Sequence, residues 1–154
     1  MILRTSWVYS LRGNSFVNKV LEWSQQRPVL SVVDDQVGSP TWARALAEAT
    51  AQLLAIVHAQ GTDWLQARQG IYHLAGSGCT SRYEWARTIL RSMPGRDKQI
   101  LQELLPAKTV EFPTPARRPL YTALNCEKFF DTFGLRLPPW ELALQMALET
   151  ERKT

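Results

Sequence analysis

The sequence is poor in the residues that build metal sites and disulfide frameworks. It has two cysteines and two histidines among 154 residues. Cys79 and Cys126 lie far apart, and neither has a second ligand at metal-binding spacing. We therefore expect no metal site and two free thiols, as is usual in the reducing cytoplasm.

Long hydrophobic runs are also missing. No apolar stretch approaches the roughly 20 residues that a transmembrane helix needs. The opening residues Met1-Ile2-Leu3-Arg4 lack the basic start, apolar middle and small-residue cleavage site of a signal peptide. These features predict a cytoplasmic protein that does not associate with membranes.

The sequence has no concentrated positive charge, although it is basic overall. Its 18 lysines and arginines exceed the 14 acidic residues by four, but they are scattered. The only adjacent pairs are Arg117-Arg118 and Arg152-Lys153. Without a basic stripe or alternating basic and aromatic residues, a nucleic-acid partner is not expected. Some arginines could instead face an anionic ligand such as a diphosphate.

The first third of the chain reads as alternating strands and helices. A strand is predicted over residues 2–9, a helix over 16–26 and a second strand over 29–33. Thr41 is placed to cap a further helix. Such alternation is typical of the α/β class, and 154 residues suffice for one domain with a hydrophobic core.

The rest of the chain continues this pattern. A short strand is expected at 71–75, and Ser81 with Glu84 has the spacing of a capping box. A short helix is predicted around residues 99–105, followed by a proline-punctuated segment. Two C-terminal helices follow, the first after Asn125 and the second starting near Pro139.

Two segments have the layout of a ligand cleft. Residues 4–9 and 34–41 each join a β-rich run to a polar, turn-forming exit. In an open α/β sheet, ligands bind where such exits gather at the carboxyl ends of the strands.

Six motifs in order carry a resemblance to a known family. They are Arg4-Thr5-Ser6-Trp7-Val8-Tyr9 with Phe16-Val17, residues 35–41, residues 70–76, Thr80-Ser81 with residues 83–86, residues 115–119, and Leu137-Pro138 with Trp140. Together they resemble the C-terminal substrate-binding half of dTDP-4-dehydrorhamnose reductases, which are extended short-chain dehydrogenases. The resemblance covers nearly all of residues 1–154. It implies the C-terminal part of a Rossmann-like fold, comprising the last sheet strands and a small α/β substrate-binding subdomain.

The resemblance implies roles for four residues. By position in its motif, Trp7 would contact the sugar, against which an indole can lay its flat face and donate its N–H. Gln36 could bond a sugar hydroxyl, and Arg118, beside Arg117, could meet the diphosphate. Ser6 would face the cofactor. The alternatives are a core position for Trp7, a plain connection at Gln36 and an internal partner for Arg118.

The catalytic and cofactor motifs of that family are not found in these residues. Ketosugar reduction there needs a nicotinamide hydride and a general-acid tyrosine whose pKa a nearby lysine lowers. None of the four tyrosines has a lysine four residues later; those positions hold Gly13, Gly76, Arg87 and Asn125. Gly76 and Gly78 share a loop, but no third glycine completes a dinucleotide-binding motif. We therefore predict no catalytic residue and no bound NADPH or NADH in this chain alone.

Three explanations fit a substrate-side half. The chain can be a truncated copy of a full enzyme, which we favour, or one piece of a split enzyme whose partner is the missing N-terminal half. It can also be a non-catalytic descendant, like the regulatory β subunit of methionine adenosyltransferase, which resembles the same reductases. The expected partners are a dTDP-sugar and either that missing half or a second copy in a homodimer.

Overall fold

The computed structural model describes residues 1–92, 99–116 and 118–151 and has the predicted α/β composition. The strands are β1 (Ile2–Arg4), β2 (Val8–Tyr9), β3 (Val29–Val33), β4 (Val37–Gly38), β5 (Thr41–Trp42), β6 (Ile71–His73), β7 (Thr80–Ser81) and β8 (Glu103–Ala107). The helices are α1 (Phe16–Gln26), α2 (Ala43–Gln60), α3 (Thr62–Gln66), α4 (Arg82–Ser92), α5 (Glu127–Phe133) and α6 (Trp140–Glu151). Across these ranges, no helix combines the length and hydrophobicity needed to cross a membrane.

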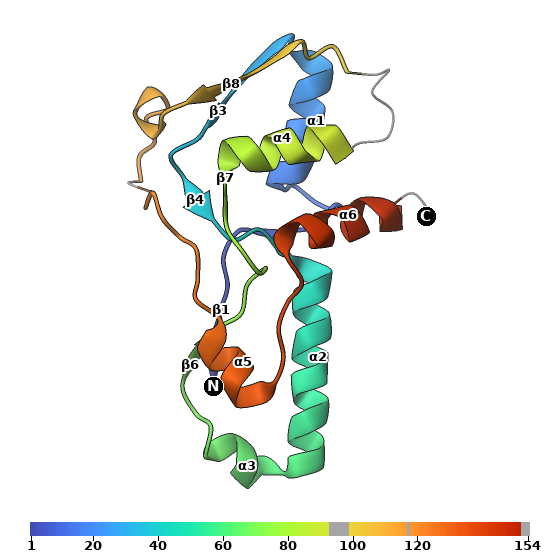
Figure 1. Ribbon diagram of the computed structural model, residues 1–154, viewed down its shortest axis with the longest axis vertical. Coiled ribbons are helices and arrows are strands. Elements are labelled where there is room, and N and C mark those ends of the chain that lie inside the picture. The colour runs from blue at the N-terminus through green and yellow to red at the C-terminus, as the bar shows by residue number, and fades with distance from the viewer. Residues whose placement is uncertain (93–98, 117, 152–154) are drawn as a thin grey trace.

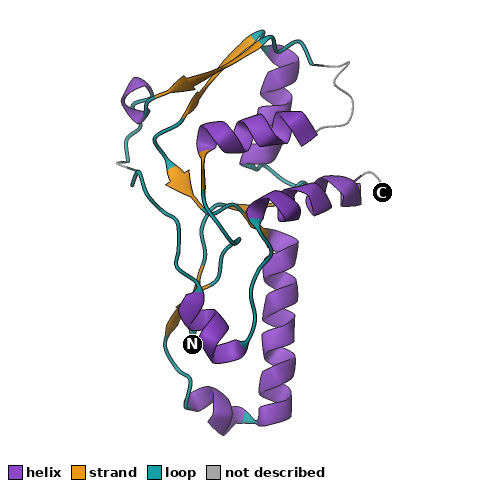
Figure 2. Ribbon diagram, viewed as in Figure 1, coloured by secondary structure: helices purple, strands orange, loops and turns teal. Residues whose placement is uncertain are grey.

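The molecule is elongated, with strands and helices at both ends (Figures 1 and 2). At one end, α1 and α4 pack together beside the parallel pair β3–β8. At the other end, α2 runs lengthwise next to α3, α5 and the parallel pair β1–β6. The short pairs β2–β5 and β4–β7 lie between the two ends.

Local signals explain where several helices begin and end. The hydroxyl of Ser15 accepts a hydrogen bond from the amide of Asn18, which caps α1. The Ser81 hydroxyl accepts from the amide of Glu84 at 3.1 Å, which confirms the predicted cap of α4. Gly134 ends α5 in the left-handed conformation, at φ 68°, that favours glycine.

The hydrophobic core connects both ends of the molecule. Trp85 on α4 is only 1% exposed and contacts Tyr9 and Phe16, while Tyr72 on β6 packs against Phe129 and Phe133 of α5. One face of the last helix is also buried, with the side chains of Trp140, Ala143, Leu144, Ala147 and Leu148.

The prediction of one continuous strand over residues 2–9 is wrong. The chain forms two short strands, β1 and β2, which pair with different partners. Between them Trp7 adopts φ 44°, a left-handed conformation incompatible with a strand. Two apolar residues of the segment are exposed, Ile2 at 58% and Val8 at 49%.

The predicted role of Thr41 as a helix cap is also wrong. Thr41 lies in β5, and α2 begins two residues later, after Trp42. The buried Thr41 hydroxyl donates to the carbonyl of Ser39 and accepts from the amide of Gly76. It therefore ties two loops together instead of capping a helix.

The predicted helix around residues 99–105 is replaced by strand β8. This strand pairs in parallel with β3, from Val29 opposite Glu103 to Val33 opposite Ala107. Pro106 fits there because β8 has only β3 as a partner among the described strands, and an edge strand tolerates a missing N–H.

Candidate functional site

The three predicted substrate-binding residues line one cavity. Trp7, Gln36 and Arg118 border a hollow of about 470 Å³. Its walls come from α1, the end of β3 and the first turns of α4. Arg117, the predicted companion of Arg118, lies outside the described residues. The sequence thus identified side chains that the fold brings together from three distant segments.

Trp7 is held at the cavity by an unusual backbone and a close glycine. It is the only non-glycine residue with positive φ in the described ranges. A Cβ atom added to Gly38 would lie over the indole, 2.6 Å from Nε1 and 2.7 Å from Cδ2. Such contact is possible only without a side chain, so Gly38 covers one face of Trp7.

Arg82 also packs against the Trp7 ring. The guanidinium carbon of Arg82 lies 3.9 Å from the centre of the Trp7 ring. Trp85 stacks beside Trp7 with its ring centre 5.6 Å away and an interplanar angle of 17°.

The contacts of Gly38 and Arg82 with the indole change how Trp7 could act in binding. The expected stacking of a sugar ring would require Arg82 to move aside. The indole N–H remains available, since it donates no hydrogen bond within the described part of the chain and is not fully buried. Contact between Trp7 and a ligand stays a prediction, with the N–H as the free group.

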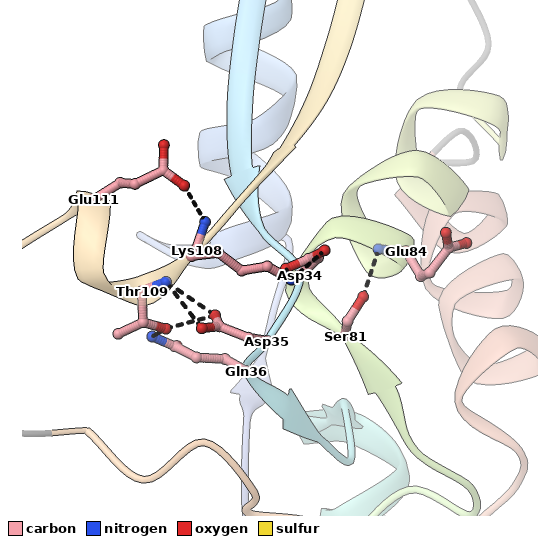
Figure 3. A network of polar contacts seen from close by, with 8 residues as sticks. All are labelled: Asp34, Asp35, Gln36, Ser81, Glu84, Lys108, Thr109 and Glu111. Atoms are coloured by element: carbon pink, nitrogen blue, oxygen red, sulfur yellow. Dashed lines mark hydrogen bonds and ion pairs between the residues drawn. The ribbon is translucent and has the colours of Figure 1, made fainter.

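Gln36 is positioned by a polar network at the end of β3 (Figure 3). Its Nε2 donates to the Thr109 hydroxyl at 3.1 Å, and this hydroxyl donates to Asp35 at 2.6 Å. The Thr109 amide also donates to Asp35. These bonds hold the pKa of Asp35 below its ordinary value. The Gln36 side chain is thereby fixed, and its carbonyl oxygen is left as an acceptor for a ligand.

Nearby carboxylates are committed to partners of their own. Asp34 forms an ion pair with Lys108 at 2.8 Å, which raises the pKa of the lysine. Glu84 pairs with Arg87 on the same helix at 2.6 Å. The carboxylates of Asp34, Asp35 and Glu84 thus each have a partner outside the cavity lining.

The cavity lining is positively charged. It includes Lys19, Arg82 and Arg118 and no acidic side chain among the described residues. Burial lowers the pKa of Arg82 to about 10, and the nearby charge of Arg118 adds to the effect. The hollow therefore suits an anion with an adjoining group that can contact aromatic rings.

Sequence reasoning missed Arg82, Lys19 and Phe16 as cavity residues. Arg82 interrupts the motif of residues 80–86, and no spacing rule singles it out. Its position at the start of a helix that follows a strand was the one available signal. Lys19 lies on helix α1, one turn after Phe16.

Ser6 lies outside the lining of this cavity. Its hydroxyl donates to the carbonyl of Ser39 at 3.3 Å. The loop with Gly76 and Gly78 does not cradle a phosphate either. A Cβ atom on Gly76 would collide with the Pro40 carbonyl, and one on Gly78 would lie 3.3 Å from Trp140. Neither glycine of this loop therefore leaves open space beside its backbone for a phosphate.

The side chains of His73, Cys79 and Cys126 do not come together in a second reactive site within the described ranges. His73 Nδ1 lies 3.2 Å from the carbonyl oxygen of Asn125, consistent with a structural role. Cys79 and Cys126 are free thiols, as predicted. No cluster of metal-binding side chains occurs in the ranges that the structure describes.

Comparison with known proteins identifies the family. The fold is of the α/β class, with the cavity at the ends of its strands. Residues 1–153 match the family model "RmlD substrate binding domain". The chain belongs to this family. It is 33% identical over 151 residues to a dTDP-4-dehydrorhamnose reductase of Burkholderia thailandensis, covering 96% of this chain and 50% of the relative. It spans about half the length of the curated relatives it matches.

Solved structures agree with this assignment. A dTDP-4-dehydrorhamnose reductase ortholog from Clostridium acetobutylicum superposes with a TM-score of 0.81 at 28% identity, over 98% of this chain and 48% of the other. The Bacillus anthracis reductase, solved in complex with NADP, gives 0.76 at 30% identity, over 97% and 47%. The predicted fold, part of an extended short-chain dehydrogenase, is confirmed.

Proposed function

We propose that this chain is the substrate-binding side of a dTDP-4-dehydrorhamnose reductase and that its cavity binds the dTDP-sugar. The observation that carries the proposal is the joining of Trp7, Gln36 and Arg118 around one positively charged hollow. Membership of the RmlD substrate-binding family supports it. A cytoplasmic location of the protein would fit this role.

Each residue would recognise a different part of the ligand. The Trp7 N–H and the Gln36 carbonyl oxygen supply one donor and one acceptor for sugar hydroxyls. The guanidinium of Arg118 supplies charged donors suited to phosphate oxygens. Few polar groups set in an aromatic wall are typical of a small-molecule site.

Reduction of the sugar ketone would need more than these residues. NADPH, when bound, supplies the hydride that goes to the carbonyl carbon, and a tyrosine would give the proton to the oxygen. We propose that the cofactor and this tyrosine belong to a cofactor-binding half, in the same protein or in a partner. The present residues would orient the ketone toward it.

The test separates binding from turnover. Calorimetric titration of the 154-residue chain with dTDP-L-rhamnose should show weak binding, with a Kd of about 1 mM. NADPH consumption with dTDP-4-dehydro-L-rhamnose should be absent. Replacing Trp7 by alanine should reduce the affinity at least tenfold.

Trp64 provides the matched control. It lies on α3 against Phe133, away from the cavity lining. Trp64→Ala should leave the affinity unchanged, and equal affinities of the two variants would contradict the proposed site. Absence of binding by the wild type would favour the regulatory alternative, a non-catalytic interaction subunit.

A further inference from the structure

Arg82 packs against three aromatic rings at the cavity. Its guanidinium carbon is 3.9 Å from the ring centre of Trp7, 4.8 Å from Phe16 and 5.6 Å from Trp85. All three rings line the cavity, as does Arg82 itself. Contacts with ring faces attract a cation, but they provide none of the oxygen acceptors that a guanidinium normally bonds.

No oxygen acceptor for the Arg82 side chain is found among the described residues. The carboxylates that follow β3 and the one in the first turn of α4 have other partners. Asp34 bonds Lys108 and Asp35 bonds Thr109 (Figure 3), and Glu84 pairs with Arg87. A partly buried arginine that serves only structure is expected to bond a carboxylate or several carbonyls. Within the described part of the chain, the N–H donors of Arg82 are therefore left without an oxygen acceptor.

The position of Arg82 is fixed from its backbone. As the first residue of α4, it donates its amide to the carbonyl of Gln36 at 3.1 Å. The Ser81 cap fixes the same turn. The base of the side chain is thus anchored to the segment that carries Gln36.

A second cation close by makes an anionic ligand more favourable still. Arg118 lines the same cavity, and its charge lowers the pKa of Arg82 together with burial. Two like charges repel one another across a partly dry hollow. A ligand group with two negative charges would offset this repulsion and would offer acceptors to both guanidinium groups.

We propose that Arg82 is the principal phosphate-recognition residue of this cavity and that, with Arg118, it clamps the diphosphate of the nucleotide-sugar. The proposal deepens the function proposed above and rests on it. The rings of Trp7, Phe16 and Trp85 contact the flat face of the guanidinium and hold it at the cavity. The donors at its edge remain directed to phosphate oxygens, the geometry for which arginine is suited.

Binding measurements on Arg82→Gln test this assignment. Titrations of the 154-residue chain use dTDP, thymidine and inorganic pyrophosphate as probes. Arg82→Gln should weaken dTDP and pyrophosphate at least tenfold and leave the weaker binding of thymidine unchanged. It should also reduce the salt dependence of dTDP binding. Arg82→Lys should restore part of the affinity because it restores the charge.

Arg87→Gln is the matched control. Arg87 lies on the same helix, exposed and paired with Glu84, and does not line the cavity. This variant should bind dTDP as the wild type does. An unchanged dTDP affinity in Arg82→Gln would overturn the assignment, as would an equal loss for dTDP and thymidine.

Pyrophosphate separates this proposal from the broader one. If the wild type binds pyrophosphate through Arg82 but not dTDP-L-rhamnose, the phosphate site stands and the proposed function fails. If Arg82→Gln does not fold, Arg82→Lys decides. Equal dTDP affinities of the wild type and Arg82→Lys, at both low and high salt, would overturn the assignment.

Discussion

At the scale of single residues, the site depends on a contact that no motif reveals. Trp7 and Gly38 both belong to segments that the sequence identified, but as separate features. The structure places the glycine directly against the indole, in space that any other residue would fill. Gly38 is therefore required by Trp7, and the positive φ of Trp7 belongs to the same arrangement.

Gly38→Ala is expected to destabilise the protein by about 1–3 kcal/mol, because the new methyl group overpacks the indole. Chemical denaturation measures this loss, and near-ultraviolet circular dichroism should report the displaced Trp7–Trp85 pair. In a Trp7→Ala background, the same change should cost much less.

The control is Gly13→Ala, since a Cβ atom there meets nothing within 4 Å. Its stability should stay close to that of the wild type. An equal cost of Gly38→Ala with and without Trp7 would show that the indole is not what requires the glycine.

At the scale of elements, the sequence predicted what local chemistry determines. Helix α1 and strand β3 have the predicted bounds, since caps, proline and β-branched residues define them. Strand β8 was missed because Glu103, Leu104 and Leu105 favour a helix, whereas pairing with β3 across about 70 residues decides the outcome. The site was predictable to the same extent: motif residues were found, but Arg82 became visible only in three dimensions.

Asp35 connects two of these elements and should make stability depend on pH. It lies just after β3 and bonds Thr109 beyond β8. Its pKa is lowered in the folded state, so its stabilising contribution is complete above the unfolded pKa of about 3.9 and is lost as pH falls through the folded value. Asp35→Asn should be less stable than the wild type at neutral pH, and the difference should shrink in acid.

Urea denaturation between pH 3 and 7 checks this expectation. Asp63→Asn, at an exposed position on helix α3, serves as the control for the loss of a carboxylate that has no bond to Thr109. A stability difference between Asp35→Asn and wild type that stays constant over the whole range would contradict the role of the carboxylate.

At the scale of the whole molecule, the sheet pairs leave apolar surface uncovered. Among the described strands, each pairs in a ribbon of two, and β1 has β6 as its only strand partner. On this ribbon Ile2 lies opposite Ile71, and these side chains are 58% and 48% exposed. Tyr72 points instead into the core with α5. An apolar ribbon with open edges is a surface for another chain.

We therefore expect the 154-residue chain to self-associate with increasing concentration, as sedimentation velocity would show. Replacing Ile2 and Ile71 by lysine should shift it toward monomer, because charges on an edge oppose pairing. Leu54→Lys tests specificity, since Leu54 is 62% exposed but lies on α2. A wild-type chain that stays monomeric at high concentration would mean that the ribbon needs no partner, and an equal effect of Leu54→Lys would place the contact elsewhere.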